Sequence, residues 1–156
     1  MTDHILALTV AAPFVAALLM LLVPGRNHGP IRVIGVTGSV LSLLGAIYVA
    51  LHYDQARGGL QFAQTYPFVP SFGIDIRLAA DGWSVALFLL TGIIMTAGSL
   101  ASATLTNRPK EFYVLLLVLV AGVFGVFVCQ DLFVFFLFYE IAVLPMYLLI
   151  GIWGSK

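Results

Sequence analysis

Long apolar stretches separated by polar segments dominate the chain. Five stretches, each about 20 residues long, have few or no charged side chains: Ile5 to Val23, Val33 to Leu51, Trp83 to Leu105, Phe112 to Cys129 and Leu132 to Trp153. A bilayer core about 30 Å thick requires roughly 20 apolar residues in a helix that rises ~1.5 Å per residue. Because backbone polar groups in lipid must be satisfied within the segment, each stretch predicts a membrane-spanning helix.

We therefore expect an all-α, polytopic membrane protein that forms a single membrane domain over residues 1–156. The expected helices cover about residues 4–23, 31–51, 83–105, 112–129 and 132–153. A transmembrane β-barrel would show alternating segments of ~10 residues, which these stretches lack. The first stretch has no basic segment before it and no small-residue cleavage site after it, so we interpret it as a retained helix rather than a signal peptide.

The loop over residues 52–82 is rich in glycine, proline and polar residues. Near its end, apolar residues alternate with others at a period of two: Ile74, Ile76 and Leu78 alternate with Asp75, Arg77 and Ala79. This pattern predicts a short strand or β-hairpin. Asp81 follows and is a candidate N-cap for the third helix.

The composition supports a membrane protein and argues against a soluble domain or a nucleic-acid-binding protein. Only 9% of residues are charged and 62% are hydrophobic, whereas soluble domains carry roughly 25% charged residues. The formal net charge is zero and there is no basic cluster, which argues against nucleic acid as a partner. Pairs of small residues four apart in the second and fourth stretches predict close helix packing: Gly35/Ser39, Gly38/Ser42 and Ala121/Gly125.

Basic residues are distributed unequally between the two sides of the membrane. One side would carry five of them: Arg26, Arg32, Arg108, Lys110 and Lys156. The other side would carry Arg57 and Arg77, in a loop that also contains three aspartates. By the positive-inside rule, we expect the N-terminus to lie outside and the C-terminus in the cytoplasm. The membrane that we expect is a bacterial inner (plasma) membrane.

Glu140 is the residue that stands out for chemistry. It lies roughly 12 Å into the fifth stretch at ~1.5 Å per residue, close to the bilayer midplane. A charged carboxylate at that depth costs at least ~2.5 kcal/mol, and such residues commonly mark ion or proton pathways. Lipid favours the neutral carboxyl and a nearby cation favours the carboxylate. We therefore predict a proton-relay role, the alternative being a permanently protonated, hydrogen-bonded side chain.

Two further residues could support Glu140. Pro145 removes a backbone hydrogen bond in the same helix, and the resulting kink could admit water beside the carboxyl or could serve packing alone. Asp131 is either the N-cap of the fifth helix or an acid at the entrance of a proton path.

No other chemical motif is present. His4, His28 and His52 lie at helix ends or in loops without metal-ligand spacing, and Cys129 is a lone cysteine, so we expect no metal site. There is no phosphate-binding glycine loop, dinucleotide fingerprint or nucleophile elbow. The remaining functions are an element of a proton or ion conduit and a purely structural membrane subunit. Glu140 has no candidate cation in any of the five stretches, so its partner would lie on other sequence.

Three segments carry a resemblance to a known family. Residues 133–154, centred on Tyr139-Glu140-Ile141, resemble the fifth helix of the antiporter-like membrane subunits of respiratory complex I, particularly the subunit M (chain 4) family. Residues 70–84 look like the outer hairpin and the start of the third helix of that family, and Lys110-Glu111-Phe112-Tyr113 is a further match. Tyr139 stands where many members have tryptophan. The resemblance runs from about Val69 to Gly154, and the first two helices fit the layout without a distinctive motif.

The resemblance implies a part of the proton-translocating membrane arm of NADH:quinone oxidoreductase. Glu140 would match the family's mid-membrane glutamate, which pairs with a lysine on a later, broken helix. Flavin, iron-sulfur clusters and quinone would belong to partner subunits, with no cofactor in this chain. Only the beginning of the family's inverted repeats would be present, so we expect a split subunit, a truncated product or a fragment that does not pump protons alone.

Three other hypotheses about the function remain open. The same fold occurs in membrane-bound hydrogenases and in multisubunit cation/proton antiporters, in which the electron donor is different or absent. In the third, the chain is a scaffold in which Glu140 stays protonated.

Overall fold

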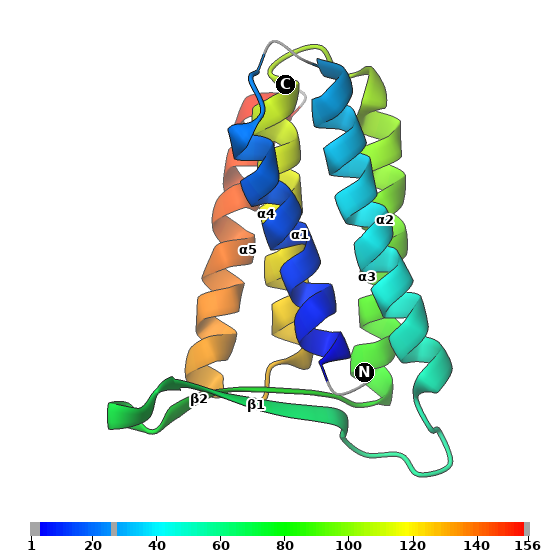
Figure 1. Cartoon of the computed structure of the whole chain (residues 1–156), viewed down its shortest axis with the longest axis vertical. Helices are drawn as coiled ribbons and strands as arrows, with labels where there is room; N and C mark the ends of the chain where they lie inside the picture. The colour runs from blue at the N-terminus through cyan, green and yellow to red at the C-terminus, as the bar shows by residue number, and fades with distance from the viewer. Residues whose placement is uncertain (1–3, 26–27, 155–156) are drawn as a thin grey trace.

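The computed structural model describes residues 4–25 and 28–154, so Arg26 and Lys156, which entered the orientation argument, lie outside the described residues. Five α-helices are long and apolar enough to cross a membrane. They are α1 (Ile5–Leu22), α2 (His28–His52), α3 (Gly82–Ala101), α4 (Pro109–Val128) and α5 (Leu132–Trp153). The helices run up and down in one bundle (Figure 1). The expected fold, five membrane helices with a hairpin in the outer loop, is confirmed.

Helix α4 forms the centre of the bundle. It packs against each of the other four helices, whereas α5 packs mainly against α4 and forms one side of the molecule. Helix α2 lies between α1 and α3 on the other side (Figure 1). Helix α4 accordingly has many buried side chains along its length, and α5 buries only Val134, Ala142 and Pro145. Most of the α5 surface is therefore free to contact lipid or another polypeptide.

A β-hairpin lies across one end of the bundle. Strand β1 (Gln61–Val69) pairs antiparallel with β2 (Ile74–Ala80), and a 3₁₀ turn (Pro70–Phe72) joins them. Gly73 ends the turn at φ +66°, a left-handed conformation that glycine adopts without a Cβ clash. The C-terminal end of β2 is buried against the helices. The Gln130 backbone N–H donates to the Arg77 carbonyl at 2.8 Å, which links the segment before α5 to β2.

Small residues let the helices approach closely, as their spacing predicts. A Cβ at Gly38 would lie 2.6 Å from that of Ala16 on α1, and one at Gly35 would overlap the Tyr113 ring on α4. On the other side of α4, a Cβ at Gly125 would overlap the Phe138 ring. Without a hydrophobic driving force in lipid, such contacts supply the packing energy between helices.

Hydroxyl groups add links between helices in the interior. Thr96 donates to the Ser39 carbonyl at 3.1 Å and joins α3 to α2. The buried Tyr113 hydroxyl donates to the Ser99 carbonyl at 2.8 Å and joins α4 to α3. Ser99 in turn donates to the Thr96 carbonyl at 3.0 Å. Each of these hydroxyls has a backbone acceptor, and the bonds from Thr96 and Tyr113 fix the positions of α2, α3 and α4 relative to one another.

Local chemistry sets several helix ends. Asp81 caps α3 by accepting the Ser84 backbone N–H at 2.7 Å, as its position predicts. Helix α4 begins at Pro109, earlier than the expected residue 112, because proline fits the first turn of a helix. Helix α2 begins at His28 rather than near residue 31, and α3 ends at Ala101 and continues as a 3₁₀ turn (Ser102–Thr104).

Replacing Asp81 by alanine should lower the stability of the chain by about 1 kcal/mol at neutral pH, because α3 loses its cap. The hydrogen bond from the Ser84 backbone N–H lowers the pKa of Asp81 below its ordinary value of 3.8. The carboxylate therefore contributes its stability above about pH 3.8 and loses it as the pH falls through the lower folded-state value. Thermal unfolding in detergent at pH 7 and under acid conditions measures both effects.

Asp81→Asn is the control, since an asparagine cap accepts the same hydrogen bond and does not titrate. It should unfold close to the unaltered chain at pH 7. An alanine variant as stable as the unaltered chain at pH 7 would show that the cap is not needed.

Candidate functional site

The site is built around Glu140 on α5. The start of α5 is fixed by Asp131, whose carboxylate accepts the backbone N–H groups of Phe133 at 3.0 Å and Val134 at 3.1 Å. Of the two readings of Asp131, the structure therefore supports the N-cap. Glu140 follows two turns later, roughly 12 Å along the helix at ~1.5 Å per residue.

Glu140 points away from the bundle. Ala142 is buried against α4, where its backbone lies beside Gly122. Glu140 lies two positions before Ala142, which is about 200° around a helix of 3.6 residues per turn. The Glu140 side chain is accordingly exposed on the free face of α5. A carboxyl in the middle of a membrane span, facing outward, is costly unless another polar group covers it.

An apolar hollow of about 290 Å³ lies beside Glu140. Its other lining residues are Val118 on α4 and Leu137, Ile141, Leu144 and Pro145 on α5. Glu140 is the one ionisable residue in this lining, so the hollow offers no internal counter-charge.

The three site residues predicted from the sequence are brought together only in part. Glu140 and Pro145 line the same hollow, whereas Asp131 lies at the start of the helix as its cap. Helix α5 continues through Pro145, whose ring is buried against the bundle, an arrangement that favours packing over helix breakage. Their roles in proton transfer remain predictions.

The ion pairs found among the described residues leave Glu140 without a partner. They join Arg77 to Asp75 at 3.2 Å and Arg108 to Glu111 at 2.6 Å, both far from the middle of α5 in sequence. A cation for Glu140 is therefore not supplied by the described part of the chain.

The side chains of the described residues do not fit a metal cofactor. In the described ranges, no three histidine, cysteine, aspartate or glutamate side chains lie together as metal ligands. Partial burial raises the pKa of the Cys129 thiol, which donates to the Asp131 carbonyl at 3.3 Å and behaves as a packing residue. An iron-sulfur cluster needs several cysteine ligands, and the sequence has one cysteine.

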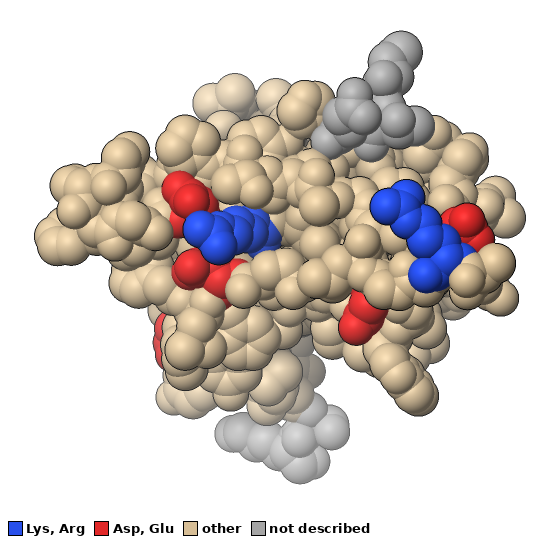
Figure 2. Space-filling view, turned by 90° about the horizontal axis from the view of Figure 1, so that it is seen from below, with Lys and Arg blue, Asp and Glu red and all other residues tan. Residues whose placement is uncertain are grey.

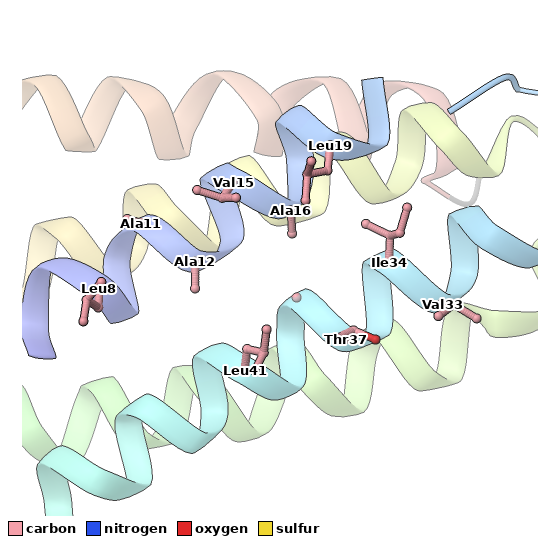
Figure 3. A pocket seen from close by; sticks show the side chains of 11 residues that line it. Leu8, Ala11, Ala12, Val15, Ala16, Leu19, Val33, Ile34, Thr37 and Leu41 are labelled. Atoms are coloured by element: carbon pink, nitrogen blue, oxygen red, sulfur yellow. The ribbon is translucent and has the colours of Figure 1, made fainter. Parts of the chain in front are cut away.

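A second groove, between α1 and α2, lacks ionisable groups. Figure 3 shows its lining from the two helices, which is apolar apart from Thr37. The groove has no group that could gain or lose a proton near neutral pH, so it is not a candidate for relay chemistry.

The two ends of the bundle differ in charge. At the hairpin end, Figure 2 shows basic side chains beside acidic ones. The charged residues in the described segments there are two arginines and four aspartates: Arg57, Arg77, Asp54, Asp75, Asp81 and Asp131. The described residues at the opposite end include three basic side chains and one acid: Arg32, Arg108, Lys110 and Glu111. Among the described residues, basic side chains outnumber acidic ones at the end opposite the hairpin and not at the hairpin end. The positive-inside rule uses a difference of this kind to assign orientation.

The sequence did not predict the contacts that join the helices at the end of the bundle opposite the hairpin. The Lys110 ammonium donates to the Leu21 carbonyl at 2.9 Å and to the Val23 carbonyl at 2.8 Å. The Trp153 indole donates to the Asn107 carbonyl at 3.0 Å. Backbone carbonyls are present at every residue, so the sequence holds no pattern that identifies these acceptors.

Five helices long and apolar enough to cross a membrane, with a hairpin across one end, define a polytopic membrane protein. The structure matches a chain of respiratory complex I from Thermus thermophilus with bound NADH, at a TM-score of 0.78 and 30% sequence identity, over 100% of this chain and 30% of that chain. No family model matches the sequence.

The sequence is similar to proteins named NAD(P)H-quinone oxidoreductase chain 4. The relative from Nostoc sp. is 40% identical over 147 residues, which is 94% of this chain and 27% of the relative. The chloroplastic relative from Chara vulgaris is 36% identical over 152 residues, 97% of this chain and 31% of the relative. The chain thus spans less than a third of the length of these relatives. The resemblance to the subunit M (chain 4) family is confirmed for this portion.

Proposed function

We propose that this chain forms part of the proton-translocating membrane arm of an NADH:quinone oxidoreductase, and that Glu140 is its proton-relay carboxyl. The name shared by the relatives and the match to a chain of complex I support the first part. The observation that carries the second is an outward-facing glutamate in the middle of a membrane span, beside an apolar hollow.

The relay follows from the surroundings of Glu140. A carboxyl in the middle of a membrane span can donate and accept a proton, and a cation on a neighbouring helix can balance its charge. A cation that moves toward and away from Glu140 would therefore make the group release and take up a proton. In the proposed assembly, a lysine-bearing helix of other sequence supplies this cation and covers the free face of α5.

Electron transfer takes place outside this chain in the proposal. Flavin and iron-sulfur centres in partner subunits oxidise NADH and reduce quinone, and this chain contributes proton movement. The charge asymmetry supports an orientation in which the hairpin lies outside and the opposite end lies in the cytoplasm of a bacterium, with the bundle in the inner membrane.

Isolation of the native assembly tests the proposed function. The chain is tagged, extracted from native membranes in mild detergent and analysed by mass spectrometry of the intact complex. We expect NADH-oxidising subunits and a polypeptide that carries the lysine helices. Hydrogenase subunits, or antiporter subunits without an electron-transfer module, would contradict the assignment to NADH:quinone oxidoreductase.

A further inference from the structure

Another hollow, of about 490 Å³, lies at the end of the bundle opposite the hairpin, between α1, α4 and α5. Its walls are apolar side chains from the three helices: Leu21, Val114, Leu115, Leu148 and Ile152. Lys110 and Glu111, in the first turn of α4, complete the lining. The hollow thus combines an apolar wall inside the membrane with charged groups at the membrane surface.

Hydrogen bonds hold the rim of this hollow in place. Lys110 donates two of its three N–H bonds to the Leu21 and Val23 carbonyls, which fixes α1 against α4. The Trp153 indole donates to Asn107, and its ring packs edge-on against Phe112, which fixes the end of α5. The ammonium of Lys110 keeps one N–H for a further acceptor.

The rim has a net positive charge. The Glu111 carboxylate pairs with Arg108 at 2.6 Å, so its charge is balanced within the chain. The Lys110 ammonium bonds to neutral carbonyls and keeps its full charge. An occupant that satisfies both parts of the hollow therefore needs an anionic group at the rim and an apolar portion along the wall.

We propose that this hollow binds an anionic phospholipid, with the headgroup phosphate on Lys110 and an acyl chain along the wall. The depth is suitable, because tryptophan side chains such as Trp153 commonly lie at the headgroup level. Anionic lipids are attracted to basic residues at the membrane surface by about 1 kcal/mol for each residue. The proposal does not depend on Glu140 or on the proposed function.

The test measures lipid retained by the full chain in nanodiscs that contain equal parts of phosphatidylcholine and phosphatidylglycerol. Native mass spectrometry after release into detergent should show phosphatidylglycerol enriched roughly fivefold over phosphatidylcholine. Lys110→Gln should lose most of this enrichment, and Lys110→Arg should keep it. Arg57→Gln, at the hairpin end, is the matched control and should retain the enrichment of the unaltered chain.

A second variant keeps the test decisive if Lys110→Gln does not fold. Leu115→Trp fills the hollow and leaves the rim charge unchanged, so it should also lose the bound lipid. Equal retention of both lipids by the unaltered chain, or enrichment that survives both variants, would overturn the proposal. Displacement of the lipid by inorganic phosphate alone would show a free-anion site and would also overturn it.

Discussion

Glu140→Gln should lower proton translocation coupled to quinone reduction by at least about tenfold, while the assembly still forms. Glutamine has nearly the same shape as glutamate and cannot release a proton, so the substitution removes the relay without a cavity. Removal of a positioned acid or base commonly costs at least this factor. Proton uptake by membrane vesicles supplied with NADH, with native electrophoresis for assembly, measures both quantities.

Glu111→Gln is the matched control for this experiment. Glu111 is the other described glutamate, it lies on the neighbouring helix at the membrane surface, and it pairs with Arg108. Its loss should leave translocation within about twofold of the unaltered assembly, as expected for a surface ion pair worth ~0–1 kcal/mol. Glu140→Asp should keep part of the activity, because a shorter carboxyl can still exchange a proton. Full translocation by Glu140→Gln would exclude the relay assignment.

Gly122→Leu should destabilise the chain by about 1 to 3 kcal/mol, the usual cost of forcing a larger side chain into a packed contact. A Cβ at Gly122 would lie 2.7 Å from the Ala142 backbone nitrogen and 3.0 Å from its Cα. Backbone atoms cannot turn aside as the end of a side chain can, so α5 must move away from α4. We expect a lower unfolding temperature in detergent and less assembled complex in the membrane.

Gly98→Leu provides the comparison for Gly122. Gly98 lies in α3, and a Cβ there would meet nothing within 4 Å. The same change of side chain should therefore leave the unfolding temperature almost unchanged. Equal destabilisation by the two substitutions would mean that the loss of glycine, rather than the contact between α4 and α5, sets the effect.

The helices and the hairpin could be predicted because their causes are local. The length of an apolar stretch determines whether it can span a bilayer, and the alternation at Ile74, Ile76 and Leu78 needs only neighbouring residues. The cap at Asp81 depends on Ser84, three residues away. The start of α4 at Pro109 was missed because the apolar stretch begins after the polar first turn of the helix.

The candidate site could be found but not oriented from the sequence. Glu140 is identifiable as an acid in the middle of an apolar stretch. Helix α5 is apolar on almost every side, however, so its composition does not distinguish the face toward α4 from the free face. The close contact of Gly122 with Ala142 sets that orientation, and it joins residues that lie in different helices. The contacts of Lys110 with the Leu21 and Val23 carbonyls could not be predicted either, because they also join residues that are far apart in the sequence.

Infrared difference spectroscopy of the intact assembly tests the central claim, proton exchange at Glu140, most directly. Spectra are recorded before and during NADH oxidation, and again across a pH titration, for the unaltered assembly and for Glu140→Gln. The account predicts a protonated-carboxyl band that changes with turnover and with pH and that is missing from Glu140→Gln. A Glu140 band that stays constant under both conditions would contradict the account and would indicate a scaffold with a permanently protonated side chain.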